Sequence, residues 1–330
     1  MRLDREMNAL RTAFGLDHLA PHHSAQLEQC ARRVSVPAGT SLYASADPRR
    51  DLCCVEAGEV ALRRSTVYGQ LVLQRVSAPG LFGELGLLDG GPRASQAVAA
   101  SDTALLELDA ERLLSEAARD PGFAVALHWG LWRNLARRLR ELNLRLGRFA
   151  PGDPTPAPTA TPPAVREAPV EERRDLLREL GLSNMEVNYL ASLSNLLELA
   201  PGQMLFAEGE APGHVYLVHS GRVMISQTVP GDGVEALAFL GRGELFGEMA
   251  VLERLPRSAR ASADQEGALV LEIRREVLEK LLDVHRASSI RLLQLACRQL
   301  AGRVRESQEK LVGWFILAGG HEEVGVLAEP

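Results

Sequence analysis

Cysteine is scarce in this sequence. The 330 residues include four cysteines, of which Cys53 and Cys54 are adjacent while Cys30 and Cys297 stand alone. No CxxC pair or Cys/His spacing is present, so neither a disulfide framework nor a zinc site is predicted. On a half-buried strand the adjacent pair would place one thiol inward and one outward. No Ser/His/Asp or Cys/His set stands out, so we expect no catalytic residues, no enzyme and no metal.

An excess of positive charge and a long apolar run are also missing. The formal net charge is −6, so nothing indicates an overall nucleic-acid-binding surface. No stretch is apolar enough to span a membrane, and the N-terminal MRLDREMNALRTAF lacks the apolar core of a signal peptide. We therefore expect a cytoplasmic globular protein. The pair His22 and His23 has no partner at metal-ligand spacing and is interpreted as a solvated turn.

The sequence contains one unusual string twice. FGELGLLDGGPRASQA occupies residues 82–97, and FGEMAVLERLPRSARA occupies residues 246–261. The similarity extends upstream, because the 25-residue segments that begin at Ala38 and Pro201 align without a gap. The repeat period is about half the chain, which indicates two copies of a whole domain rather than a solenoid.

A proline-rich segment separates the two copies. Seven prolines fall within residues 150–169, and such a composition forms an extended, semi-stiff spacer. We therefore predict a first domain over residues 1–149, a linker over 150–170, a second domain over 171–318 and a short tail over 319–330.

Each copy contains short strand patterns separated by Gly and Pro turns. In the first copy these are SLYAS, LCCVEA, VALRRS, LVLQRV and ALLELD, and regular short strands of this kind indicate an antiparallel sandwich or barrel. Helical patterns flank the strands over residues 3–33, 109–147, 171–198 and 274–315. The predicted fold class is mainly β with flanking helices (α+β), and each copy is followed by a long amphipathic helix.

The helical pattern after each copy carries an apolar stripe. In the first copy its residues are spaced 3, 4, 3 and 4, and they are Trp132, Leu135, Leu139, Leu142 and Leu146. A period of 3.5 residues is typical of a coiled-coil seam. A similar stripe runs from Leu293 to Trp314. Such a helix either packs on its own β domain or, as we favour for residues 132–146, forms a homodimer.

The repeated string holds a carboxylate and a guanidinium nine residues apart. An Arg after Pro in a turn presents a fixed guanidinium that suits a phosphate. A Gly before Glu lets backbone approach a ligand closely, and the following helical turn offers free N–H groups to an anion. The carboxylate is repelled by a phosphate unless the same ligand donates a hydrogen bond to it, as a ribose hydroxyl does. These features together describe a 3′,5′-cyclic nucleotide.

At these residues each copy resembles the cyclic nucleotide-binding domain of catabolite-activator-type regulators, protein kinase regulatory subunits and gated channels. The resemblance covers residues 36–147 and 199–315. It implies a β-roll of eight strands, of the double-stranded β-helix or jelly-roll type, and a last helix that moves when ligand binds. The glutamate would bind the ribose 2′-hydroxyl, the arginine the cyclic phosphate, and the next residues would support it. The implied binding residues are Gly83, Glu84, Leu85, Arg93, Ala94 and Ser95, and Gly247, Glu248, Met249, Arg257, Ser258 and Ala259.

Each copy departs from the family pattern at a few positions. Ala46 stands where the family has a turn glycine, which the second copy keeps at Gly209. Gln96 and Arg260 replace the usual Thr or Ser, and LERLP in the second copy lacks a glycine. The cation of Arg260 could support or block the base. Neither copy loses its Glu or its Arg.

Two functions from different classes follow. The first is a sensor of a cyclic mononucleotide, cyclic AMP more than cyclic GMP, which signals to an unidentified effector protein. Its helices would hinge near residues 109–112 and 274–277, with a residue near Trp129 or Leu293 closing over the base. The second is a scaffold that keeps the fold without the ligand. Few and acidic residues follow the second helix, so no DNA partner is expected, and no membrane partner either.

Overall fold

The computed structural model divides the chain into two compact units. This division differs from the two halves of the sequence. The last helical residues of each half are grouped with the roll of the other half. Unit 1 contains residues 1–135 and 300–322, and unit 2 contains residues 136–299 and 323–330. Within these bounds the structure describes residues 10–14, 21–147, 163–229, 233–282 and 290–321.

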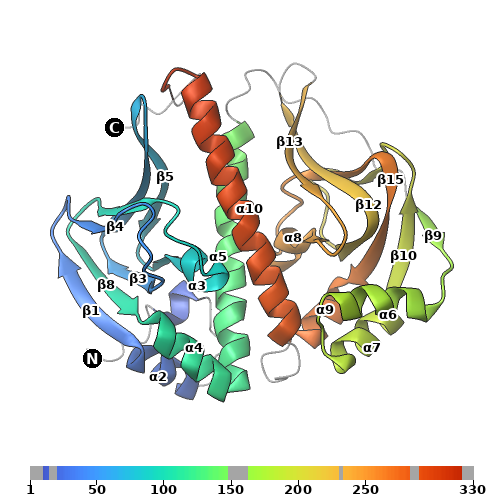
Figure 1. Cartoon of the computed structure of the whole chain (residues 1–330), viewed down its shortest axis with the longest axis horizontal. Helices are drawn as coiled ribbons and strands as arrows, with labels where there is room; N and C mark the ends of the chain where they lie inside the picture. Colours follow the sequence, from blue (N-terminus) through green and yellow to red (C-terminus); the bar gives the residue numbers. More distant parts are fainter. Residues whose placement is uncertain (1–9, 15–20, 148–162, 230–232, 283–289, 322–330) are drawn as a thin grey trace. The chain divides into compact units, whose positions relative to one another are not determined.

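In the described part of unit 1, eight strands form a β-roll of two antiparallel sheets (Figure 1). One sheet has the order β1-β8-β3-β6 and the other the order β2-β7-β4-β5. The strands are β1 (Ala31–Val36), β2 (Ser41–Tyr43), β3 (Leu52–Ala57), β4 (Glu59–Thr66), β5 (Gly69–Ser77), β6 (Gly80–Phe82), β7 (Gln96–Ala99) and β8 (Thr103–Leu108). All five predicted strand patterns of this copy coincide with strands, and the eight-stranded roll is confirmed.

The core of this roll is built from aliphatic and aromatic side chains and one cysteine. Its buried residues are Tyr43, Cys53, Val55, Val60, Leu62, Val76, Phe82 and Ala97. Cys53 and Cys54 are both buried, so the expectation of one outward thiol is wrong. The cause is that β3 is covered on both faces, as Leu52 to Val55 are all buried.

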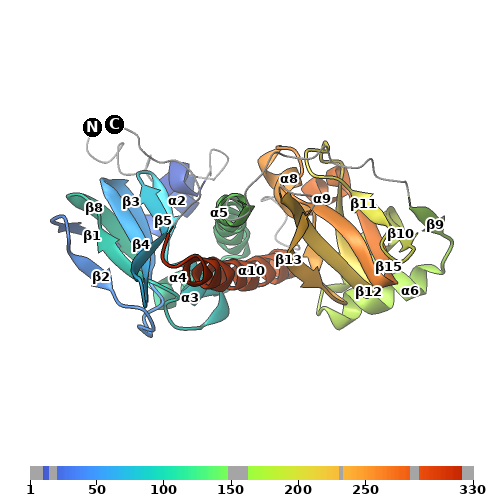
Figure 2. The same cartoon turned by 90° about the horizontal axis from the view of Figure 1, so that it is seen from above.

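Unit 2 contains the second β-roll, in which two strands are much longer (Figure 2). Its sheet has the order β13-β12-β15-β10-β9, with β11 paired to β15 and β14 paired to β12. The strands are β9 (Ala164–Arg166), β10 (Ser194–Leu199), β11 (Met204–Phe206), β12 (His214–Val229), β13 (Gly233–Leu240), β14 (Leu245–Phe246) and β15 (Arg260–Arg274). β9 lies in the predicted linker and pairs with β10 at Leu196–Glu198, so the end of that segment belongs to the sheet.

The flanking helices follow the predicted ranges in part, and residues 194–198, at the end of the predicted helical range 171–198, belong to β10 instead. They are α2 (Pro21–Gln29), α4 (Ala110–Arg119), α5 (Pro121–Gly147), α6 (Val170–Glu179), α7 (Asn184–Leu193), α9 (Arg275–Leu281) and α10 (Ile290–Leu317). The pattern over 109–147 breaks at Asp120 because Pro121 cannot continue a helix from its N-terminal side. Of the predicted helical range 3–33, residues 3–9 and 15–20 lie outside the described residues, α2 ends at Gln29, and residues 31–36 form β1.

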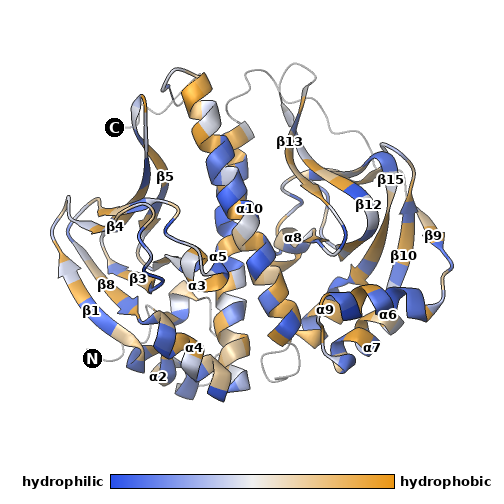
Figure 3. Cartoon of the chain, viewed as in Figure 1, coloured by the Kyte–Doolittle hydropathy of each residue, from blue (hydrophilic) through white to orange (hydrophobic). Residues whose placement is uncertain are grey.

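Both long helices alternate between apolar and polar residues along their length (Figure 3). The stripe predicted to form a homodimer is already buried within the single chain, with Leu135 at 0%, Leu139 at 4% and Leu142 at 2% exposure. The observation that favoured a homodimer therefore has another explanation. Among the residues that the structure describes, no helix combines the length and apolarity needed to cross a membrane.

Candidate functional site

Each repeated string forms one compact loop, which we name cassette 1 (residues 82–97) and cassette 2 (residues 246–261). Cassette 1 contains the short helix α3 (Glu84–Asp89), and cassette 2 contains α8 (Glu248–Glu253). Each helix follows a glycine in the left-handed region, Gly83 with φ 90° and Gly247 with φ 77°. These glycines turn the chain from strand into helix and bring the two functional side chains of each cassette together.

Arg93 is buried in cassette 1 with its guanidinium held by backbone. Its Nη1 donates to the carbonyl of Gly83 at 3.0 Å, and its Nη2 donates to the carbonyl of Asp51 at 2.6 Å. The guanidinium lies 4.2 Å from the centre of the Tyr43 ring. Its buried Nε has no hydrogen-bond partner among the described residues. One N–H of a fixed cation is therefore available to an anion.

Cassette 2 repeats this arrangement at the aligned positions. Arg257 donates from Nη1 to the carbonyl of Gly247 at 2.6 Å and from Nη2 to the carbonyl of His214 at 2.8 Å. Its guanidinium lies 4.2 Å from the centre of the Phe206 ring. Its Nε is buried and, within the part of the chain described, makes no hydrogen bond. Both cassettes thus present the same cation in the same way.

The glutamates of the two cassettes are the first residues of the short helices. Glu84 is 0% and Glu248 is 2% exposed, so both carboxylates lie inside the cassettes. A Cβ on Gly83 would lie 2.5 Å from Nη1 of Arg93, which shows how closely the glycine backbone approaches the cation. The same Cβ would lie 2.8 Å from the carbonyl oxygen of Asp51, so only glycine fits at position 83.

The remaining predicted residues surround these pairs. Leu85, Ser95 and Ala259 are buried, and Ala94, Met249 and Ser258 are half-buried. The carbonyl of Ala94 accepts a 2.7 Å hydrogen bond from Nη1 of Arg64, and the carbonyl of Ser258 accepts one at 3.0 Å from Nε2 of Gln227. Side chains of the rolls, Arg64 and Gln227, therefore hold the loop after each arginine.

The two departures from a turn glycine are accommodated by strained backbone. Ala46 adopts φ 64°, whereas Gly209 at the aligned position adopts φ 81°. Both donate their N–H at 2.9 Å to the carbonyl of the cassette arginine, Arg93 or Arg257. In cassette 2, Arg254 adopts φ 54° where cassette 1 has Gly90. The loops keep their geometry, so neither departure removes a site.

Arg260 and Gln96 are engaged with their own rolls. The Nε of Arg260 donates to Oγ of Ser226 at 2.9 Å, and Nε2 of Gln96 donates to Oγ of Ser41 at 3.1 Å. The cation of Arg260 is thus held by a neighbouring strand.

Burial makes the cationic form of Arg257 costly. Burial lowers the pKa of this arginine, while Tyr216, Glu210 and Glu248 act in the opposite direction. Burial also raises the pKa of Tyr216 to about 12, so this phenol stays neutral beside the guanidinium. A second anion at the free Nε would offset the desolvation of the cation.

Sequence reasoning missed two arginines that contact the cassettes from long helices. Arg305 of α10 pairs with Asp89 of cassette 1, and Arg140 of α5 pairs with Glu253 of cassette 2. The sequence analysis predicted that a helix residue near Trp129 or Leu293 contacts the ligand, because each helix was expected to pack on the roll that precedes it. The sequence does show that both helices carry charged residues such as Arg140 and Arg305. Charged residues are common on helix surfaces, however, so their presence alone does not indicate a contact with a cassette.

The histidine pair near the N-terminus is also placed differently from the prediction. His23 is buried, and Asp120 brings a carboxylate within 4.8 Å of both imidazoles. Asp120 is occupied, however, because it accepts hydrogen bonds from the N–H groups of Gly122 and Phe123 and from Gln26. Asp120 therefore stabilises the start of α5 through the N–H groups of Gly122 and Phe123.

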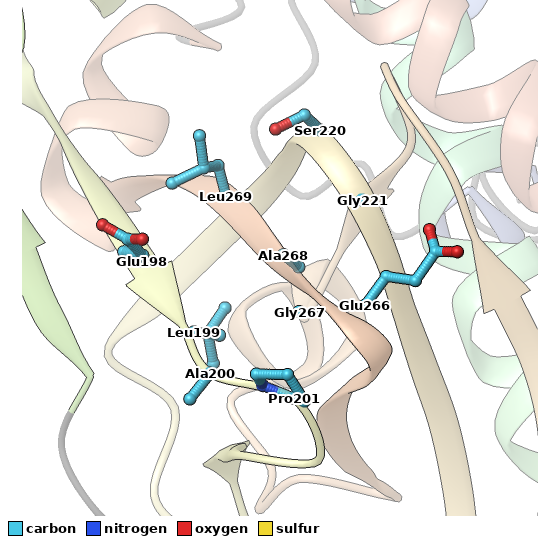
Figure 4. A pocket seen from close by; sticks show the side chains of 10 residues that line it. All are labelled: Glu198, Leu199, Ala200, Pro201, Ser220, Gly221, Glu266, Gly267, Ala268 and Leu269. Atoms are coloured by element: carbon cyan, nitrogen blue, oxygen red, sulfur yellow. The ribbon is translucent and has the colours of Figure 1, made fainter.

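A depression of about 380 Å³ lies on the second roll away from these residues (Figure 4). None of its ten lining residues belongs to a cassette, and they include two carboxylates, Glu198 and Glu266, and no cationic side chain. An anion would be repelled there, so this depression is not a phosphate site.

Comparison with known proteins agrees with this geometry. Residues 33–120 and 196–285 match the family model described as "Cyclic nucleotide-binding domain". Over 135 residues the chain is 38% identical to the Cyclic AMP receptor protein of Thermus thermophilus, which covers 40% of this chain and 58% of that protein. Over 276 residues it is 27% identical to the cAMP-dependent protein kinase regulatory subunit of Colletotrichum orbiculare, covering 78% of this chain and 57% of that one.

Solved structures include similar chains as well. The N-terminal domain of a transcriptional regulator from Streptomyces coelicolor is 33% identical, with a TM-score of 0.35, and covers 40% of this chain and 93% of its own. The chain spans little more than half the length of the two curated relatives named above. The two family matches together cover more than half of the chain, and the chain therefore belongs to the cyclic nucleotide-binding domain family.

Proposed function

We propose that both cassettes bind a 3′,5′-cyclic mononucleotide and that cyclic AMP is the preferred ligand. The observation that carries this proposal is the paired arginine geometry. In each cassette a buried guanidinium is fixed by two backbone carbonyls while its Nε remains available, next to a buried glutamate. One singly charged phosphate matches the cation, and a ribose hydroxyl matches the carboxylate.

The chain would act as a regulatory protein that transmits ligand binding to an effector protein. A ligand shifts a helix only if it binds one arrangement better than the other. The last strand of each roll leads directly into a helix, since β8 ends at Leu108 before α4 and β15 ends at Arg274 before α9. We propose these two junctions as the hinges. The relatives named above include a kinase regulatory subunit, which supports a protein partner as the recipient of the signal.

The test is calorimetric titration of the full chain with cyclic AMP, cyclic GMP and a cyclic dinucleotide. Arg93→Ala and Arg257→Ala should each remove one binding event, with a loss of roughly 2–4 kcal/mol at the altered site. Arg93→Lys and Arg257→Lys keep the charge but lose the fork and should also weaken binding. Unfolding curves of the unliganded variants control for the lost backbone contacts.

Substitution of a cassette glutamate gives an independent test of the proposed ribose contact. Glu248→Gln should reduce the preference for cyclic AMP over its 2′-deoxy analogue, because the carboxylate is proposed to accept the 2′-hydroxyl. If the wild-type chain binds none of these ligands, the scaffold function is the better description. If it binds them with unchanged affinity in both arginine variants, the ligand lies elsewhere.

A further inference from the structure

Two histidines and one aspartate from distant parts of the sequence meet in unit 1. His22 and His23 lie in the first turn of α2, and Asp120 lies at the corner between α4 and α5. Figure 1 shows α2 at the same end of unit 1 as α4. One ligand atom from each of the three residues lies within 4.8 Å of the other two. The fold therefore gathers two imidazoles and a carboxylate at one place.

The separations suit a shared ion better than a direct contact. Nε2 of His23 lies 3.8 Å from Oδ2 of Asp120, which is too long for a hydrogen bond. Ligand atoms held tetrahedrally at about 2.1 Å from one metal ion lie about 3.4 Å from one another. The rings of His22 and His23 have their centres 4.1 Å apart. Because His22 is exposed, its ring can turn to bring a nitrogen to the same point.

The hydrogen bonds already described occupy only part of the Asp120 carboxylate. Oδ1 accepts the N–H groups of Gly122 and Phe123, and Oδ2 accepts Nε2 of Gln26 at 3.1 Å. A carboxylate has about four lone-pair positions, so these three bonds leave one, on the oxygen that faces His23. The same bonds fix the direction of the carboxylate, as supporting groups do around metal ligands.

His23 is held in position by the start of α5. The residue is 8% exposed, and its ring centre lies 6.3 Å from that of Phe123. A Cβ on Gly122 would lie 3.2 Å from Nε2 of His23 and 3.3 Å from Cε1, so the ring reaches this place because residue 122 is glycine. One imidazole of the group is thus anchored beside Asp120, and the exposed imidazole of His22 leaves the group open to ions in solution.

The donor atoms indicate the class of ion. Two histidines, one carboxylate and a water form one of the ligand sets that proteins use for Zn²⁺. Imidazole nitrogen also suits Cu²⁺ and Ni²⁺, whereas Mg²⁺ and Ca²⁺ prefer oxygen ligands alone. An ion held by these three residues would connect α2 to the corner between α4 and α5.

We propose that His22, His23 and Asp120 bind one divalent transition-metal ion, such as Zn²⁺, which connects α2 to the start of α5. The ion stabilises unit 1. None of its three ligands belongs to a cassette, so the site is independent of the proposed function.

The test uses the full chain without a histidine tag, after treatment with a chelator. Calorimetric titration with Zn²⁺ should give one ion per chain, and Co²⁺ should acquire the visible absorption of a protein-bound ion. His22→Ala and Asp120→Asn should each weaken Zn²⁺ binding at least about tenfold. Asp120→Asn keeps a side-chain oxygen for the N–H groups at the start of α5. The matched control is His321→Ala, another exposed histidine, which should change the affinity less than about twofold.

A stability measurement separates the loss of a ligand from misfolding. Zn²⁺ should raise the melting temperature of the wild-type chain, because an ion that binds only the folded chain favours it. The increase should be absent in His22→Ala, and Mg²⁺ or Ca²⁺ at the same concentration should cause no comparable increase. Because His22 is exposed, its substitution should leave the melting temperature without metal nearly unchanged.

Three results would overturn the inference. The first is a chelator-treated wild-type chain that takes up neither Zn²⁺ nor Co²⁺, and the second is a His22→Ala chain with wild-type affinity and stoichiometry. The third is a thiolate charge-transfer band in the Co²⁺ spectrum, which would assign the ion to the cysteines, all four of which are buried. Arg93→Ala and Arg257→Ala should bind Zn²⁺ as the wild type does, so failure of metal binding and failure of nucleotide binding are separate outcomes.

Discussion

At the scale of single residues, each cassette carries strain at a different place. Cassette 1 has a glycine at the end of its short helix but is joined to Ala46 at a left-handed position, while cassette 2 has Gly209 there and Arg254 at its helix end. A side chain in the left-handed region costs roughly 1–2 kcal/mol. Both repeats bear this cost once, which identifies two positions where the chain is less stable than it could be.

Ala46→Gly should stabilise unit 1 by about 0.5–1 kcal/mol, because the relief of left-handed strain exceeds the added freedom of glycine in the unfolded chain. The measurement is urea unfolding of the full chain. Gly209→Ala is the matched control and should destabilise, since a Cβ there meets no atom within 4 Å and only the backbone strain changes. Equal stability of both variants would show that this turn relaxes freely.

At the scale of elements, the start of each helix after the first roll is fixed by an aspartate. Asp109 accepts a 2.8 Å hydrogen bond from the N–H of Arg112 at the start of α4. Asp120 accepts from Gly122 at 2.9 Å and Phe123 at 3.1 Å at the start of α5. The break between α4 and α5 is thus stabilised by side-chain caps. It sets the direction of α5, whose later part contacts cassette 2.

Asp120→Ala should reduce stability by about 1 kcal/mol through loss of this cap. The hydrogen bond from Phe123, followed by that from Gln26, lowers the pKa of Asp120 in the folded chain. A carboxylate with a lowered pKa stabilises the fold above its unfolded pKa of about 3.9, and this stabilisation is lost as pH falls through the folded value. The difference between wild type and Asp120→Ala should therefore be present at pH 7 and vanish at low acid pH. A constant difference across that range would contradict the cap.

Much of the fold could be predicted from the sequence, because short strands and glycine turns leave local patterns. The five strand patterns of the first copy lie where they were expected, and the Glu and Arg of each cassette are buried. Arg305 and Arg140 were not found, because their role depends on which roll each helix reaches. Periodicity shows that a helix has an apolar face, but it does not show which surface covers that face. The strand β9 was missed for a related reason, since its pairing with β10 outweighs a proline-rich composition.

At the scale of the whole molecule, the four thiols are internal probes of both units. Cys30, Cys53 and Cys54 lie in unit 1 and Cys297 in unit 2, and all four are buried. Burial raises the pKa of Cys53 and Cys54 to about 12 and raises that of Cys297 as well. Both access and thiolate formation are therefore suppressed in the folded chain.

Native thiol labelling at pH 8 should accordingly be slow at all four cysteines and become fast in urea. Cyclic AMP should slow the labelling of the native chain further, because a ligand that binds only the folded units reduces their opening. Mass spectrometry of the labelled peptides assigns the rate to each cysteine. Rapid labelling of Cys53 before unfolding would mean that the interior of the first roll is accessible.

Hydrogen exchange should distinguish a switch from a simple binder. If the helices respond to ligand, saturation with cyclic AMP should change exchange in 110–147 and 290–317 as well as in the cassettes. The Arg93→Ala and Arg257→Ala variants indicate which site causes each change. Protection confined to the cassettes would favour a binder that does not transmit a signal through these helices.

Since residues 300–322 belong to unit 1 and residues 136–147 to unit 2, we expect that the chain cannot be divided at its proline-rich segment into two folded halves. A fragment ending at residue 149 would keep the first roll but lose residues 300–322, and its leucines at 139, 142 and 146 would lose the unit that buries them. Such a fragment should self-associate or precipitate, whereas the two halves produced together should recover a soluble pair. A single proteolytic cut in the linker should leave the two halves associated, because each half contributes a helix segment to the unit that contains the roll of the other half.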